Sequence, residues 1–280
     1  MGKRRVKNTY EHYCNKLQDG RGCGQGVDYI PWHSGHEFAS NGAYVRMKGF
    51  TVPREYVFFS HLESDVFRIY DHTPGVTDIK EQYPLPLSDT LTIADRLGIR
   101  HPYKDSFYNV VTTDLLIRKD GNWIGRAIKS SADLKKKRIV EKLNIECEWF
   151  RQNRIQWRIV TEKEINREFV TNLKWLYEDG EDYTSLVPDP EARQLYEREL
   201  LNLYKEEAFS FSEILEIIEE AFSIGNGTSM AVFKHLVRTK QICIDMEKQF
   251  NLKNPRQPLE RRGERYGRYS SYAPANHPGS

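Results

Sequence analysis

The sequence lacks any run of about eighteen apolar residues, the length that a transmembrane helix needs. No apolar stretch follows the basic segment 1–7, so we do not expect a secretory signal. The chain also contains no C-x-x-C pair and no zinc-type spacing among its four cysteines, which are Cys14, Cys23, Cys147 and Cys243. Disulfides and zinc are therefore not expected, and free thiols fit the reducing cytoplasm.

A large excess of charge is also lacking, because 42 lysines and arginines face 40 acids among the 280 residues. The charges are unevenly placed, however. Residues 1–7 and 253–280 each carry a net charge of +4, which leaves a net charge of −6 on the residues between them. Basic ends on an acidic body suggest arms that contact a polyanion, while the body alone would bind DNA weakly. Solvated ends without a partner fit the same composition.

The first part of the chain has the pattern of an α/β domain. A helix is predicted from Ser60, where apolar residues recur at helical spacing and Ser60 with Glu63 forms an S-x-x-E capping box. A charged helix is predicted further on, and a second capping box at 161–164 precedes the next helix. The predicted strands and the charged helix cover residues 76–83, 110–118, 123–129, 155–160 and, for the helix, 133–152.

The pattern changes to helices after residue 164. A short strand is predicted at 242–244, and Ser229 is expected to cap the helix before it. A helix, a glycine turn, a second helix and a strand are typical of a winged-helix module, although a small helical bundle has the same signature. Residues 253–280 hold one leucine and no valine or isoleucine, so they are expected to be disordered. The predicted helices cover 165–177, 191–205, 212–222 and 229–238.

A hairpin holds the best candidates for chemistry. If residues 120–121 form a two-residue turn, Asp114 lies opposite Ala127, and Lys129 is its diagonal neighbour on the same face. An acid within an apolar strand is costly unless it is paired or ligates a metal. A cross-strand salt bridge would satisfy this requirement. A hydrolytic Mg²⁺ site would also satisfy it, with the carboxylate holding the ion and the lysine orienting the attacking water.

Such a metal site needs a second carboxylate. Glu63 is the best candidate, because apolar residues surround it at helical spacing. The capping box alone also explains an acid at this position. Reasoning from the residues therefore reaches a possible Mg²⁺ site and no reaction.

A succession of short motifs runs along the chain. The most specific motifs are Gly20-Arg21-Gly22 to Gly26 with 28–32, and Ser60-His61-Leu62-Glu63. The remaining motifs are residues 78–85, 98–102, 113–114, 141–143 and the segment from Trp157 to Trp175. In this succession the chain resembles the TnsA family, the endonuclease subunits of heteromeric bacterial cut-and-paste transposases. The resemblance covers about residues 18–177 well and the helical C-terminal part loosely.

The resemblance implies a restriction-endonuclease-like fold of the PD-(D/E)xK class, with a mixed sheet flanked by helices, over residues 1–164. It implies a small, mostly helical, winged-helix-like domain over 165–252, followed by the basic tail. By the same resemblance, Glu63 and Asp114 ligate Mg²⁺, for which Mn²⁺ can substitute, Lys129 is the catalytic lysine and the carbonyl of Ile128 adds a ligand.

One position departs from the family pattern. Two residues before the lysine the family usually carries Glu or Gln, whereas this chain carries Ala127, whose methyl group cannot ligate a metal. Among the acids of the helix predicted over 133–152, Glu146 falls where the resemblance also places an acid. We therefore expect either one tightly bound Mg²⁺ or a second ion recruited through Glu146.

The implied role is hydrolysis of the 5′ strands of double-stranded DNA at transposon ends, in the cytoplasm and without a membrane. A TnsB-type transposase would cut and join the 3′ strands, and a TnsC-type ATPase would engage the C-terminal part. The helix with Lys234, His235 and Arg238 contacts either DNA or a partner protein. Two alternatives stay open: a stand-alone restriction or repair nuclease of the same fold, and a catalytically weak adaptor, which Ala127 keeps possible.

Overall fold

The computed structural model describes residues 7–34, 44–177, 183–206 and 208–253. The chain forms two compact units, Met1–Ile165 and Asn166–Ser280. The predicted basic arms lie almost entirely outside the described residues. Within these residues, no helix combines the length and the apolar character that crossing a membrane requires.

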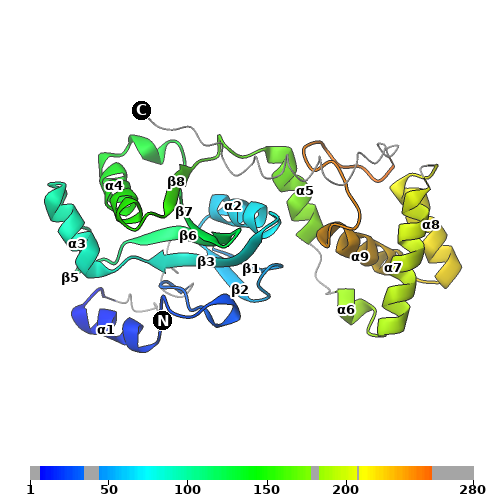
Figure 1. Cartoon of the computed structure of the whole chain (residues 1–280), viewed down its shortest axis with the longest axis horizontal. Helices are drawn as coiled ribbons and strands as arrows, with labels where there is room; N and C mark the ends of the chain where they lie inside the picture. Colours follow the sequence, from blue (N-terminus) through cyan, green and yellow to red (C-terminus); the bar gives the residue numbers. More distant parts are fainter. Residues whose placement is uncertain (1–6, 35–43, 178–182, 207, 254–280) are drawn as a thin grey trace, which may run out of the picture. The chain divides into compact units, whose positions relative to one another are not determined.

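The first unit is built on a four-stranded mixed sheet of order β3-β6-β7-β8 (Figure 1). Pairs β3–β6 and β6–β7 are antiparallel, and β7–β8 is parallel. Since parallel neighbours need a crossover connection, helix α4 (Lys137–Gln152) links β7 to β8. The predicted mixed α/β sheet is thus confirmed. Its strands are β3 (Val76–Pro84), β6 (Thr112–Lys119), β7 (Asn122–Ile128) and β8 (Gln156–Val160).

Helices cover both faces of this sheet, because successive residues of a strand point to opposite faces. Leu115 and Ile117 of β6 pack in one buried cluster with α2 (His61–Asp71). Leu116 packs in another cluster with α4 and with α3 (Leu87–Arg96). Burial on both faces explains why Leu115, Leu116 and Ile117 follow one another in β6 without an apolar–polar alternation.

The first unit has further short elements that the sequence analysis did not identify. Strands β1 and β2 form one antiparallel ribbon, and β4 and β5 form another. Strands of two to four residues are too short to show a clear periodicity. These elements are α1 (Tyr10–Gln18), a 3-10 turn (Gly26–Asp28), β1 (Val45–Lys48), β2 (Glu55–Phe58), β4 (Tyr103–Lys104), β5 (Phe107–Tyr108) and a second 3-10 turn (Asp133–Lys135).

The hairpin between β6 and β7 has the predicted register near its turn, but the predicted pairing of Asp114 with Ala127 does not form. Asp120 and Gly121 occupy the turn with φ of 49° and 80°, as a two-residue turn with both central residues left-handed requires. Lys119 pairs with Asn122, and the pairing continues to Leu115 and Arg126. The local turn therefore fixes which residues of the two strands meet.

The two predicted capping boxes have different outcomes. Ser60 caps α2 as expected, since its side chain accepts a hydrogen bond from the Glu63 backbone N–H at 3.1 Å. No helix begins at Thr161, where the prediction is wrong. Helix α5 (Arg167–Tyr177) starts after Asn166, whose side chain accepts from the N–H groups of Glu168 and Phe169.

The described part of the second unit is helical. Two predictions are wrong there: Ser229 lies inside α9, which begins after Gly225, and residues 242–244 form no strand. The Tyr204 hydroxyl instead holds this segment through the backbone N and O of Cys243. The described residues of this unit thus lack a β-strand wing, and the winged-helix prediction is not confirmed. The remaining helices are α6 (Tyr183–Leu186), α7 (Pro190–Lys205), α8 (Phe211–Phe222) and α9 (Asn226–Arg238).

Candidate active site

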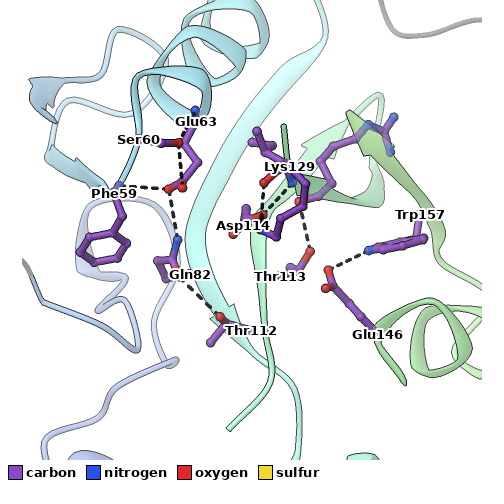
Figure 2. A network of polar contacts seen from close by, with 12 residues as sticks. Phe59, Ser60, Glu63, Gln82, Thr112, Thr113, Asp114, Lys129, Glu146 and Trp157 are labelled. Carbon is purple, nitrogen blue, oxygen red and sulfur yellow. Dashed lines mark hydrogen bonds and ion pairs between the residues drawn. The ribbon is translucent and has the colours of Figure 1, made fainter. Parts of the chain in front are cut away.

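Asp114 lies where β6 and β7 separate. The backbone pairing of the two strands ends at Leu115 and Arg126, one step before Asp114 would pair with Ala127. Beyond that point, side chains of β6 form the hydrogen bonds to the backbone of β7. The Thr113 hydroxyl donates to the Arg126 carbonyl at 3.2 Å, and Asp114 Oδ2 accepts from the Ile128 N–H at 2.6 Å (Figure 2). The opening of the hairpin therefore places the carboxylate beside the end of β7.

Lys129 forms an ion pair with Asp114, which is the cross-strand salt bridge that the sequence left open beside a Mg²⁺ site. Its Nζ lies 2.6 Å from Asp114 Oδ2 and also donates to the Ile128 carbonyl at 2.8 Å (Figure 2). Burial disfavours the ammonium form, but the attraction of Asp114 outweighs it, so the pKa of Lys129 is raised above its ordinary value. Lys129 is thus a firmly protonated cation at neutral pH.

Glu63 serves both the helix start and the site. Its Oε1 accepts from the Ser60 hydroxyl at 3.0 Å, and its Oε2 accepts from the Phe59 N–H at 3.1 Å. The Glu63 side chain therefore accepts from the N–H of Phe59, the residue before the N-cap, whereas a capping box would use the N–H of Ser60. Burial, followed by the negative charge of Asp114, raises the pKa of Glu63 to about 7. The two carboxylates thus lie close enough to repel each other.

Gln82 is a site residue that the sequence analysis missed. Its side-chain amide makes two long contacts of 3.5 Å, one to Glu63 Oε2 and one from the Thr112 hydroxyl (Figure 2). Its φ of 49° is strained for a side chain of this size, and such strain gathers at functional sites. The signal available in the sequence was a neutral amide within the strand predicted over 76–83. Gln82 connects Glu63 to β6.

Glu146 of α4 brings a third acid to the same cluster. Its carboxylate is buried, and Oε1 accepts a hydrogen bond from Trp157 Nε1 at 2.8 Å (Figure 2). Burial, followed by the charge of Asp114, raises the pKa of Glu146 to about 7. The same carboxylate helps to raise the pKa of Lys129. The structure therefore brings all five site residues of the first unit together: Glu63, Asp114, Ile128, Lys129 and Glu146.

The donor atoms at this cluster suit a hard cation. Both bonds to Asp114 end on Oδ2, and Oδ1 accepts none of the hydrogen bonds among the described residues. Within the same part of the chain, no three His, Cys, Asp or Glu side chains converge into a metal-binding group. Mg²⁺ does not need such a group, because it usually binds through one or two carboxylates and keeps several waters. A bound cation would also reduce the repulsion between the buried carboxylates of Glu63, Asp114 and Glu146, which have Lys129 as a shared positive partner.

Glu146→Gln is expected to stabilise the metal-free protein at high pH. The folded pKa of Glu146 lies above the unfolded value of about 4.3, so stability is fully present below that pH and is lost as the pH rises towards 7. The neutral amide removes this loss and can still accept from Trp157. The variant should therefore exceed the native protein by about 3–4 kcal/mol at pH 8, with little difference at pH 4.5.

Urea unfolding in EDTA at both pH values measures this difference. Glu141→Gln, a change on the same helix at a partly exposed position, is the control. An equal gain at both pH values would contradict the assignment of the effect to ionisation.

The second unit holds the three residues predicted to contact DNA or a partner. Lys234 is buried and points inward: its Nζ donates to the Trp175 carbonyl at 2.7 Å and lies 4.6 Å from the centre of that ring. His235 packs on Tyr183 with the ring centres 4.7 Å apart, and it is only partly exposed, as Arg238 is. The ammonium of Lys234 therefore bonds within the second unit and does not point to the surface.

Comparison with known proteins links both units to one family. Residues 73–162 match the family model described as TnsA-like endonuclease N terminal, and residues 164–246 match TnsA endonuclease C terminal. Together these matches span more than half of the chain. The transposon Tn7 transposition protein TnsA of Escherichia coli is 40% identical over 165 residues, which are 58% of this chain and 60% of that relative. The match thus covers less than two thirds of the relative's length.

Proposed function

Because the chain belongs to the TnsA endonuclease family, we propose that it is the DNA endonuclease subunit of a cut-and-paste transposase in the cytoplasm. The observation that carries this proposal is the pairing of Asp114 with Lys129 beside Glu63. A carboxylate pair with a lysine is suited to the hydrolysis of phosphodiesters. The C-terminal match supports a specialised subunit rather than a general nuclease.

Mg²⁺ is the proposed cofactor, held by Glu63, Asp114 and the carbonyl of Ile128, and it would polarise the scissile phosphate and acidify a bound water. Because the pKa of Lys129 is raised, we do not assign it the role of general base. It instead stabilises negative charge that develops on the phosphate and orients the attacking water. The bonds from Ile128 and Lys129 hold the Asp114 carboxylate in one orientation.

The proposed substrate is the 5′ strand of double-stranded DNA at each transposon end. A TnsB-type transposase would act on the 3′ strands, and a TnsC-type ATPase would regulate the assembly. The acidic body of the chain supports delivery to DNA by partners, since its net charge of −6 opposes strong binding to phosphates. A stand-alone nuclease would need a basic surface to bind its substrate.

The second unit is proposed to dock the ATPase. In the proposed winged-helix-like arrangement, helices α8 and α9 with the turn between them would form the helix-turn-helix part. Since Lys234 is bonded internally, a large DNA contact through α9 would depend on His235 and Arg238. Two partly exposed cations favour a protein partner over DNA.

Cleavage of end DNA with and without the partners tests the proposal. Each strand of the duplex is labelled separately, and the chain is incubated with Mg²⁺ alone, with the transposase, and with transposase and ATPase. We expect 5′-strand cleavage only with the partners. Cleavage by the chain alone at an equal rate would identify a stand-alone nuclease, and no 5′ cleavage under any condition would identify an adaptor.

Glu146→Gln is also expected to raise the Mg²⁺ concentration for half-maximal 5′ cleavage by about tenfold, as loss of a residue next to the ligands usually does. Ala127 is fully buried and offers no oxygen ligand, and we propose that Glu146 provides a further carboxylate near the ion. Titration of the cleavage rate with Mg²⁺ measures the shift, with Glu141→Gln as control. An unchanged Mg²⁺ requirement would exclude a role of Glu146 in metal binding.

A further inference from the structure

A pocket of about 240 Å³ opens in the first unit between α1, the β4–β5 ribbon and α4. This volume is somewhat below the roughly 300–1,000 Å³ of pockets that enclose a whole drug-sized ligand. The pocket therefore suits a part of a larger molecule. Its lining combines rings with cations, and the residues that matter for the argument are Lys16, Trp32, Lys104, Tyr108, Thr112 and Lys142.

The charge of the pocket favours an anion. Lys104 and Lys142 line it, and neither forms a salt bridge with a described residue. The acid in the lining, Asp105, accepts a hydrogen bond from the Asn8 N–H at 2.9 Å. Lys16 at the buried end donates to the Trp32 carbonyl at 3.2 Å. Lys104 and Lys142 thus leave two ammonium groups available to a ligand in the pocket.

Aromatic rings supply a second kind of contact. Tyr108 is 39% exposed and packs edge-on against Tyr103, with the ring centres 5.2 Å apart. Trp32 is buried, with Tyr13 at 5.9 Å, and forms an apolar wall. Cations beside an exposed aromatic face suit a nucleotide, because its phosphate is anionic and its base can stack.

The pocket adjoins the candidate active site through two elements. Thr112 lines the pocket and lies two residues before Asp114 on β6, a separation of roughly 7 Å. Lys142 lies one helical turn before Glu146, and its charge acts on that carboxylate. Gln82 joins the two regions, because its side chain contacts both Glu63 and Thr112 (Figure 2) and its carbonyl accepts from the Trp32 N–H at 3.4 Å.

We propose that this pocket is a subsite for one nucleotide of the strand that is cut: Lys104 and Lys142 bind a backbone phosphate, and Tyr108 packs against the sugar or base. The inference rests on the proposed endonuclease function. Phosphates of one strand follow each other every 3.4 Å along the axis of duplex DNA. Because Thr112 of the lining lies only roughly 7 Å from Asp114, we expect the bound phosphate among the few nucleotides next to the scissile one.

Single methylphosphonate substitutions test the subsite, because each removes the charge of one phosphate. The three positions on either side of the cut are replaced one at a time, and 5′ cleavage is measured in the full assembly with native protein and Lys104→Ala. We expect one position at which the substitution slows the native protein about three- to tenfold and adds nothing to the effect of Lys104→Ala. Lys104→Arg should restore the sensitivity of the native protein.

Lys48→Ala, an exposed lysine of β1 outside the pocket, is the matched control and should keep the native response. Tyr108→Leu should weaken DNA binding, whereas Tyr44→Leu, at a similarly exposed tyrosine, should not. The subsite would be overturned if, at every position, the methylphosphonate slowed the Lys104→Ala protein by the same factor as the native protein. If the native assembly cleaves no unmodified 5′ strand, the endonuclease proposal fails and the subsite with it.

Discussion

Asp114→Asn is expected to lower the rate of 5′-strand cleavage by about three orders of magnitude, comparable to the loss of a preorganised electrostatic group. The amide oxygen can still accept from the Ile128 N–H, so the end of β7 should keep its position. The amide carries no charge, however, and can neither pair with Lys129 nor hold a cation as a carboxylate does. Single-turnover cleavage with saturating partners measures the loss.

Asp120→Asn is the matched control, since it makes the same chemical change in the same hairpin. Asp120 lies in the turn at a positive φ, where asparagine is readily accepted. Native cleavage by this control and loss in Asp114→Asn locate the effect at the carboxylate. Cleavage by a well-folded Asp114→Asn protein within about threefold of native would remove the proposed site.

Lys129→Met should produce the second large effect, a loss of at least about two orders of magnitude in 5′ cleavage. The methionine keeps the length of the side chain and removes the cation that lies 2.6 Å from Asp114. It also leaves a largely buried carboxylate without its ion pair, which should destabilise the fold by about 2 kcal/mol. Urea unfolding and single-turnover cleavage separate the two consequences.

Lys129→Arg distinguishes catalysis from stability. The guanidinium keeps the charge and can still pair with Asp114, so the free energy of unfolding should stay close to native. Its planar, wider group cannot place a single ammonium at the same point, so cleavage should remain at least about tenfold below native. Full cleavage by Lys129→Arg would reduce Lys129 to a structural partner of Asp114.

The hairpin shows what local sequence determines. An Asp-Gly turn and strands with a period of two residues were enough to predict the register from Lys119 to Leu115 and the approach of Lys129 to Asp114. The separation of the strands beyond Leu115 was not predictable, because it depends on side chains that replace backbone bonds. The Asp114 bond to the Ile128 N–H belongs to this tertiary level.

Contacts between distant segments explain the misses at Lys234 and Gln82, whereas the miss at Thr161 is local. Lys234 looks like a surface cation on a predicted helix, but the carbonyl and ring of Trp175, 59 residues earlier, hold its ammonium inside. Thr161 has the same capping pattern as Ser60, yet Asn166 caps the helix that follows. The amide of Gln82 could not be recognised as a site residue from the sequence, because its contacts are to Glu63 of α2 and Thr112 of β6.

The most direct test of the central claim is the strand-resolved product of a transposon-end duplex in the assembly with Mg²⁺. Both strands are labelled, and the native chain is compared with Asp114→Asn in the presence of the same transposase and ATPase. The account predicts that native protein yields cut 5′ and 3′ strands, whereas Asp114→Asn yields only the cut 3′ strand. Equal 5′ cleavage by both proteins, or none by the native protein at any Mg²⁺ or Mn²⁺ concentration, would contradict it.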